Sequence, residues 1–228
     1  MVVFHVGSGR SEFLFTASVS TCNDSLIRSL CRVHNLRLRL AALSDALEEL
    51  GHSNVAKSLQ EQGLDTEGAS DKERGQFNGV YRWDRVSSEL PDVLVRVAAD
   101  AKMALNSKTQ VARRVCIEEN ELLEKLQNIR KAVSMAFPMG LPSGDPVKRM
   151  LDADDVEEAL ASTLAVLDVM PEDTAELWWA GKQFLRDQYV RDLTGEHEKS
   201  TLLVNLQKHE NGAPSRMHDV SLWTSIKR

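Results

Sequence analysis

The sequence predicts an α+β protein that is mostly helical, with an N-terminal β-hairpin and helix followed by a helical C-terminal half. Two apolar stretches rich in Val and Phe flank a glycine-containing turn near the N-terminus, and leucines then recur at helical spacing over much of the chain. The 228 residues are 42% hydrophobic and 27% charged, which is typical of a globular protein with a sizeable core.

The hairpin is expected at residues 2–6 and 12–19, which are separated by Gly7-Ser8-Gly9-Arg10-Ser11. Glycine tolerates positive φ angles, so this segment suits a tight connection between two strands. It completes neither a GxGxxG nor a GxxxxGK pattern, which favours a turn over a phosphate-binding loop.

A long helical stripe should follow, because Ser20–Asp24 offer several N-capping side chains. We expect one broken helix or two, with a break at Asn35 and a stop at Gly51. A hairpin followed by a helix is how a β-grasp unit begins, although the sequence does not reveal the remaining strands. The stripe consists of Leu26, Leu30, Val33, Leu36, Leu40, Leu43, Leu47 and Leu50.

The chain divides by composition into four segments. Residues 1–62 form the hairpin and helix unit. Residues 63–90 contain four glycines among polar residues and form a flexible linker, in which 80–83 could add a short strand. Residues 91–216 form a helical domain, and 217–228 form a C-terminal tail.

Helices in the second half are predicted from Pro91 to Asn106 and over 117–136, where apolar residues recur with a/d-like spacing. Three aspartates at 152, 154 and 155 open a further helix that carries Val156, Leu160, Thr163 and Leu167 in line. Helices around Ala175–Tyr189 and Glu198–Glu210 complete the expectation.

Nothing in the sequence indicates catalysis, a metal or a cofactor. The six histidines are scattered without HExxH spacing, and Cys22, Cys31 and Cys116 are too far apart to form a local metal site. The three cysteines are expected to be reduced thiols in the cytosol. Carboxylates that gather at helix N-termini are better explained by the helix dipole than by acid–base chemistry.

Charge and hydropathy favour a cytoplasmic protein that binds other proteins. Residues 101–150 carry a net charge of +4 and residues 151–200 a net charge of −9. This polarity suits encounters with other charged proteins and suits nucleic acid poorly. No apolar run approaches the ~20 residues of a membrane span, and the N-terminus does not resemble a secretory signal.

Two segments are candidates for binding. The loop Phe137–Pro146 holds three prolines and two glycines, so it should be rigid. It is either a core-capping connection between helices or a preformed docking ridge that presents Met139 and Leu141. In a helix, Trp178 and Trp179 would point ~100° apart, so one should enter the core and the other serve as an interface anchor, unless both are buried between helices.

Four segments in this order resemble the Kurly family of cilia- and flagella-associated proteins: Phe137–Pro146, Ala175–Ala180, Gly195–Ser200 and Asn211–Arg216. Arg82-Trp83-Asp84-Arg85 departs from the Gly-Arg-Arg-x-Gly stretch that the family pattern has there. The motifs identify as candidate partner-binding residues Pro138, Met139, Gly140, Leu141, Pro142, Asp145, Trp178, Trp179, Glu198, Lys199 and Arg216.

The resemblance implies a scaffold or adaptor for the cytoplasmic preassembly of axonemal dynein arms, required for motile cilia and flagella. It implies no catalysis and no cofactor. The implied partners are chaperones, axonemal dynein subunits and other assembly factors, among them a MYND zinc-finger protein. The implied location is the cytoplasm, with some of the protein in the cilium. The alternatives are a stoichiometric structural component of the axoneme and an enzyme that uses the acidic helix ends.

Overall fold

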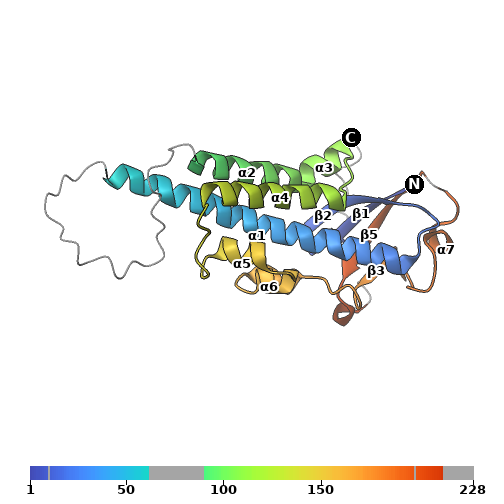
Figure 1. Ribbon diagram of the computed structural model, residues 1–228. Helices are drawn as coiled ribbons and strands as arrows, with labels where there is room; N and C mark the ends of the chain where they lie inside the picture. Colours follow the sequence, from blue (N-terminus) through green and yellow to red (C-terminus); the bar gives the residue numbers. More distant parts are fainter. Residues whose placement is uncertain (10, 62–89, 198, 213–228) are drawn as a thin grey trace, which may run out of the picture. The chain divides into compact units, whose positions relative to one another are not determined.

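The computed structural model describes residues 1–9, 11–61, 90–197 and 199–212 (Figure 1). The chain folds into two compact units, neither of which is continuous in sequence. The first, here called the sheet unit, comprises Met1–Asn35, Asn106–Glu119 and the chain from Asp168 onward. The second, the helical unit, comprises Leu36–Leu105 and Asn120–Leu167.

Five strands form one sheet in the order β2-β1-β5-β3-β4. Strands β1 and β5 are parallel, and every other neighbouring pair is antiparallel. This order is that of a β-grasp fold, so the arrangement suggested by the hairpin and helix is present, and its missing strands come from the C-terminal part of the chain. The strands are β1 (Val2–Ser8), β2 (Ser11–Ala17), β3 (Glu176–Trp179), β4 (Lys182–Gln183) and β5 (Thr201–Gln207).

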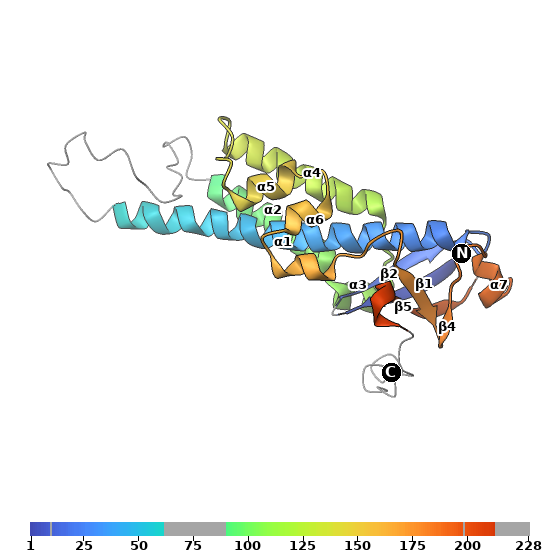
Figure 2. The ribbon, with the colours of Figure 1, turned by 90° about the horizontal axis from the view of Figure 1, so that it is seen from below.

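Alternating apolar residues give the sheet one buried face. Phe4 lies between Phe15 of β2 and Leu202 of β5, and Val6 lies between Phe13 and Val204. The first part of α1 (Asn23–Glu61) runs along the sheet (Figures 1 and 2) and contributes Leu26, Ile27, Leu30 and Val33, each at most 1% exposed.

The prediction of helices around Ala175–Tyr189 and Glu198–Glu210 was wrong. The first segment holds β3 and β4, and the second holds β5 and the start of the short helix η2 (His209–Asn211); the short helix α7 (Val190–Thr194) lies between the two segments. In β5 the residues Leu202, Val204 and Leu206 are buried at every second position, which is the period of a strand. Leucine favours helices, but pairing with β1 on one side and β3 on the other decides the conformation here.

Helix α1 is continuous, so the break at Asn35 and the stop at Gly51 were also wrong. The Asn35 side chain is buried and bonds the backbone of Met170 twice, with Nδ2 donating to the carbonyl at 2.8 Å and Oδ1 accepting from the amide at 2.9 Å. Its polar atoms are therefore satisfied outside the helix ladder. Gly51 lies within the helix, and a Cβ there would be 2.7 Å from Cγ2 of Val95.

The helical unit combines the later part of α1 with α2 (Leu90–Leu105), most of α4 (Glu119–Ala136), α5 (Pro146–Asp152), α6 (Val156–Leu160) and the start of η1 (Leu164–Asp168). Pro91 lies in the first turn of α2, as predicted, and Leu122, Ile129, Val133 and Ala136 of α4 are buried. Helix α3 (Ser107–Arg113) belongs to the sheet unit and contacts β2. The expected strand at 80–83 lies outside the described residues.

Two polar contacts fix helices within this unit. Lys102 of α2 pairs with Glu48 and, at 2.7 Å, with Asp45 of α1. The buried Arg39 guanidinium donates to the carbonyl oxygens of Met150 and Ala153 at 2.6 and 2.8 Å, so it caps the C-terminal end of α5. Burial lowers the pKa of Arg39, and the neighbouring Arg130 lowers it further.

Candidate interaction surfaces

The two tryptophans lie in strand β3 and therefore point to opposite faces of the sheet. Trp179 shares the face of Leu177, which is fully buried, and lies opposite Val204 of β5. Trp178 lies on the other face opposite Asn205. Both indoles are half-buried. The sequence predicts both in a helix, with one or both in the core, and neither arrangement is observed.

Glu176 holds the Trp178 indole in place. Indole Nε1 donates to Oε2 of Glu176 at 2.9 Å, and Nδ1 of His209 lies 2.6 Å from Oε1. Burial raises the pKa of Glu176, but hydrogen bonds from His209 and Trp178 outweigh burial and hold that pKa below its usual value. The carboxylate is therefore anionic at neutral pH, and Trp178 presents a ring fixed at its polar end.

The turn after the tryptophans has unusual backbone angles. Ala180 and Gly181 connect β3 to β4 with φ values of 49° and 80°. Two consecutive positive φ angles define a two-residue type I′ hairpin turn, which favours Asn or Gly at its first position. An alanine there is strained because its Cβ crowds the backbone in the left-handed region.

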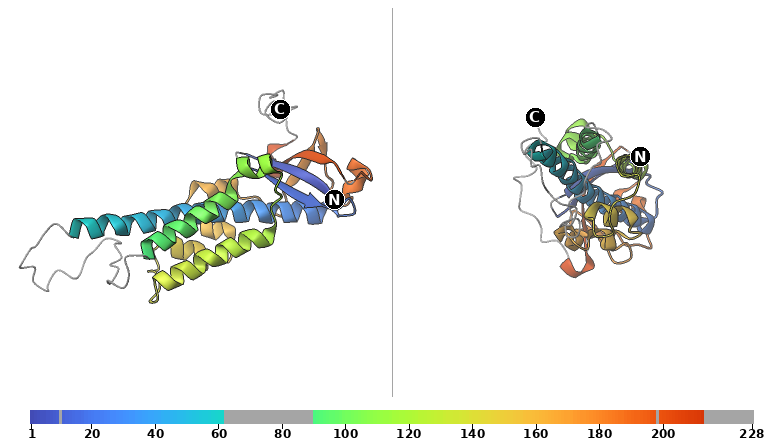
Figure 3. Two further views of the ribbon diagram at one scale, coloured as in Figure 1. Left: turned by 90° about the horizontal axis from the view of Figure 1, so that it is seen from above. Right: turned by 60° about the vertical axis from the view of Figure 1, so that its left-hand side comes forward.

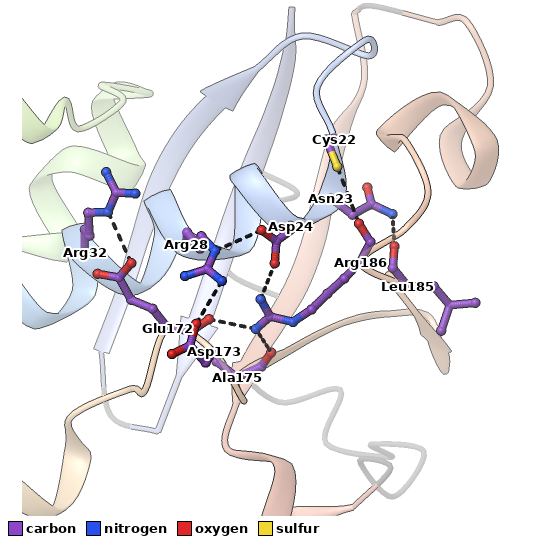
Figure 4. Close-up of polar contacts among 10 residues, drawn as sticks. All are labelled: Cys22, Asn23, Asp24, Arg28, Arg32, Glu172, Asp173, Ala175, Leu185 and Arg186. Carbon is purple, nitrogen blue, oxygen red and sulfur yellow. Dashed lines mark hydrogen bonds and ion pairs between the residues drawn. The ribbon is translucent and has the colours of Figure 1, made fainter.

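Arg186 connects the segments that flank this hairpin to the start of α1 (Figure 4). Its guanidinium pairs with Asp24 and donates to the carbonyl oxygens of Glu172 and Ala175, both at 2.8 Å. Asn23 Nδ2 donates to the carbonyl of Leu185 at 2.8 Å. The strand that carries the tryptophans is therefore tied to α1 on both sides of its hairpin.

A chain of ion pairs extends this network along α1. Arg28 lies 2.9 Å from Asp24 and 2.8 Å from Asp173, and Arg32 lies 3.4 Å from Glu172. Hydrogen bonds from Arg28 and then from Arg186 lower the pKa of Asp24. The spacing of Asp24 and Arg28 by four residues signals their pairing in the sequence, whereas nothing in the sequence indicates that Arg186 joins them.

The proline-rich loop presents one residue and buries another. Met139 is 99% exposed, whereas Leu141 is 5% exposed. Asp145 is buried and caps α5, where its Oδ1 accepts from the backbone amides of Val147 and Lys148 at 2.7 and 3.3 Å. The loop therefore has the predicted core-capping role, since Leu141 and Asp145 complete the core and helix α5, whereas docking through Met139 stays a prediction. The expectation that Leu141 is presented for docking was wrong.

The remaining candidates are exposed or undescribed. Pro138, Gly140 and Pro142 are exposed on the loop, and Lys199 is exposed before β5. Glu198 and Arg216 lie outside the described residues. In the part of the chain that the structure describes, no cluster of three or more His, Cys, Asp or Glu residues could hold a metal ion. No described helix has the length and apolar character needed to cross a membrane.

One apolar surface was missed by sequence reasoning. Leu164 and Leu167 of η1 are 86% and 69% exposed, although Leu167 continues the apolar line of Val156 and Leu160. The line is interrupted because α6 ends at Leu160 and a turn bonds the amide of Thr163 to the Leu160 carbonyl at 2.8 Å. The five-residue length of α6 could not be read from the periodicity.

These observations define a class of protein: a β-grasp sheet unit whose sequence is interrupted by a helical unit, with half-buried tryptophans on a strand tied to α1. A family model described as cilia- and flagella-associated protein 298 matches residues 175–225, the segment that holds β3, β4, Arg186 and β5. No solved structure matches the chain.

Curated relatives match almost the whole chain. The cilia- and flagella-associated protein 298 of Danio rerio is 32% identical over 243 residues, covering 97% of this chain and 81% of the relative. The Homo sapiens protein is 31% identical and the Drosophila melanogaster protein 25% identical, each match covering 95% of this chain and 79% of the relative. The chain belongs to the cilia- and flagella-associated protein 298 family, which confirms the resemblance drawn from its motifs.

Proposed function

We propose that this protein is a non-enzymatic scaffold that acts in the cytoplasmic preassembly of axonemal dynein arms. The observation that carries the proposal is the similarity, along 95% or more of the chain, to proteins named for cilia and flagella in vertebrates and fly. The family link supports a role connected with cilia. The step to dynein assembly follows from the motif resemblance in the loop and in the tryptophan segment.

The surface chemistry is consistent with protein binding. Met139 projects from a loop that Asp145 and Leu141 hold rigid, so little ordering entropy would oppose its contact with a partner. Trp178 and Trp179 keep part of each indole accessible on a strand tied to α1, and tryptophan is enriched among residues that dominate binding energy. The proposed partners are other dynein assembly factors, including a MYND zinc-finger protein, chaperones and axonemal dynein subunits.

Fractionation of ciliated cells tests the proposal. The protein would be quantified in detergent-soluble cytoplasm and in salt-washed axonemes, beside a dynein heavy chain. An assembly factor is expected mostly in the cytoplasm, at levels far below those of dynein. Salt-resistant retention at a fixed ratio to the axonemal repeat would identify a structural component of the axoneme instead. Absence from ciliated cells would contradict both roles.

Two variants in one loop separate binding from folding. Met139→Asp is expected to reduce capture of assembly factors while the melting temperature stays within about 1 °C, because an exposed side chain contributes little to stability. Leu141→Asp places a carboxylate in the core and should destabilise by about 4 kcal/mol. Equal capture by Met139→Asp and the wild type, with Met135→Asp as the exposed control, would remove the loop from the binding surface.

A further inference from the structure

The exposed leucines of η1 form a pair on one side of a short helix. Residues three apart in a 3₁₀ helix lie directly above one another, so Leu164 and Leu167 present adjacent side chains. Their exposed fractions of 86% and 69% are high for leucine. Isolated exposed leucines are common on protein surfaces, but a contiguous apolar patch bounded by polar groups is typical of an interaction site.

Five carboxylate side chains lie shortly before this leucine pair in the sequence. The segment 152–167 contains no lysine or arginine, and all five of its acidic side chains are exposed. Within the described residues none of the five forms an ion pair, whereas Asp45 of α1 pairs with Lys102. These residues are Asp152, Asp154, Asp155, Glu157 and Glu158.

Local hydrogen bonds keep the leucines close to the carboxylates. Both the amide and the hydroxyl of Thr163 donate to the Leu160 carbonyl, at 2.8 and 2.9 Å, which forms a tight turn between α6 and η1. Helices α5 and α6 also contact each other, as Figure 2 shows. The two leucines and the acidic segment therefore form one local surface of the helical unit.

The charge of this surface decides what can bind it. Arg39 interacts electrostatically with Asp154 and Asp155, but its guanidinium is buried and binds backbone carbonyls, so the exposed carboxylates leave this surface negative. Such a surface repels the phosphates of nucleic acids and anionic lipid surfaces, and it repels acidic peptides. A basic polypeptide is attracted, and its apolar side chains would cover the leucines. We propose that the leucine pair and the five carboxylates form a docking site for a basic amphipathic segment of a partner protein, with lysines or arginines facing the acids. This proposal does not depend on a ciliary role.

The test uses synthetic peptides as probes. A fluorescein-labelled peptide of about 18 residues, with leucine and lysine at helical spacing, would be titrated by anisotropy with the full chain. Matched peptides would replace every lysine by glutamate or every leucine by alanine. The leucine–lysine peptide is expected to bind, and both replacements should weaken binding. Raising the salt from 0.1 M to 1 M, where the Debye length falls from about 10 Å to about 3 Å, should also weaken it.

Variants of the chain locate the site. Leu164→Ser/Leu167→Ser should weaken binding about tenfold, since two apolar anchors are lost. Glu157→Gln/Glu158→Gln should weaken binding and flatten its salt dependence. The matched controls are Met103→Ser/Met135→Ser, which removes side chains that are each 70% exposed, and Glu121→Gln/Glu124→Gln on α4. Both controls should bind within twofold of the wild type.

Three results would overturn the proposal. The first is absence of binding by the leucine–lysine peptide. The second is an equal loss of peptide affinity in a control variant and in its matched variant, which would indicate an effect of net charge or of exposed apolar side chains in general. The third is a wild-type dimer in sedimentation equilibrium that Leu164→Ser/Leu167→Ser converts to monomer. In that case a second copy of the chain, rather than a basic partner, covers the leucines. Circular dichroism melting of each variant excludes unfolding as the cause.

Discussion

The two units use an arginine in different ways to hold backbone carbonyls. In the helical unit Arg39 is buried, 7% exposed, and its guanidinium donates to the carbonyl oxygens of Met150, Leu151 and Ala153 at the end of α5. In the sheet unit Arg186 is partly exposed and divides its bonds between carbonyls and the carboxylate of Asp24. The first contact depends on burial and geometry, whereas the second also depends on charge and therefore on salt and pH.

The largest effect is expected at Arg39. Arg39→Met should lower the free energy of unfolding by about 3 kcal/mol, because the buried Met150 carbonyl and the partly buried Ala153 carbonyl lose a charged donor. Arg39→Lys should recover less than half of the loss, since an ammonium cannot reproduce the planar fork of donors. Urea unfolding measures both values. Full recovery by lysine would show that charge, rather than geometry, matters at this position.

Arg186 should have a smaller effect that depends on salt. We expect Arg186→Met to lower the free energy of unfolding by about 1–2 kcal/mol, since its side chain is 29% exposed and water can replace part of its contacts. The loss should shrink in 1 M salt, while the loss from Arg39→Met should not. A salt-independent loss at Arg186 would remove the contrast between the two units.

The pH dependence of the sheet unit follows from Asp24. Its pKa is lowered in the folded state by Arg28 and Arg186, so its contribution is fully present above the unfolded pKa of about 3.9. That contribution is lost as the pH falls through the lower, folded value. The difference in unfolding free energy between the wild type and Asp24→Asn should therefore shrink below about pH 4. A difference that grows on acidification would contradict the ion pairs of Figure 4.

Gly51 tests how tightly the helical unit is packed. Gly51→Ala should destabilise by about 1 kcal/mol despite the better helix propensity of alanine, because its Cβ would lie 2.7 Å from Val95 Cγ2 and 3.3 Å from the Pro91 carbonyl. The double variant Gly51→Ala/Val95→Ala should regain part of the loss. The melting temperatures of the single and double variants measure this effect. A stabilising Gly51→Ala would show that α2 moves to accommodate the added Cβ.

Ala180 should respond in the opposite direction with the smallest effect. Ala180→Asn is expected to stabilise by about 0.5 kcal/mol, since asparagine tolerates the left-handed conformation that the β3–β4 turn imposes. Ala180→Val should destabilise, because a branched side chain is strained at φ 49°. If both substitutions are neutral in chemical unfolding, the turn adapts to its residue.

Local patterns predicted the hairpin and the long helices better than the strands of the C-terminal part. The hairpin and α4 follow from alternation, spacing and turn residues that lie close together in sequence, and α1 was predicted as helical but with a break and an early stop that it does not have. Strand β5 was missed because Leu202 and Leu206 also fit a helix, and β3 was missed because Trp178 and Trp179 were placed in a helix; only the pairing of the two strands decides their conformation. The Asp24–Arg186 contact spans 162 positions, so it was beyond any argument from spacing.

The candidate sites divide in the same way. The rigidity of the proline-rich loop was predictable from its composition, but the burial of Leu141 beside an exposed Met139 depends on how the helical unit packs. The exposed leucines of η1 continue a regular apolar line, so only the early end of α6 at Leu160 reveals them. In this chain the misplaced surface therefore lies where a short helix stops before its apolar pattern ends.

The parallel pairing of β1 with β5 (Figure 3) has a consequence for synthesis of the chain. Val3 pairs with Thr201, so at 5–20 residues per second the ribosome needs about 10–40 s to supply the strand that completes the centre of the sheet. During that interval the inner edge of β1 has no neighbour, and its backbone donors and acceptors are open to other strands. While this chain is being synthesised there is therefore a period in which protection from aggregation is valuable. In the same period the helical unit can fold before the sheet whose strands flank it in the sequence.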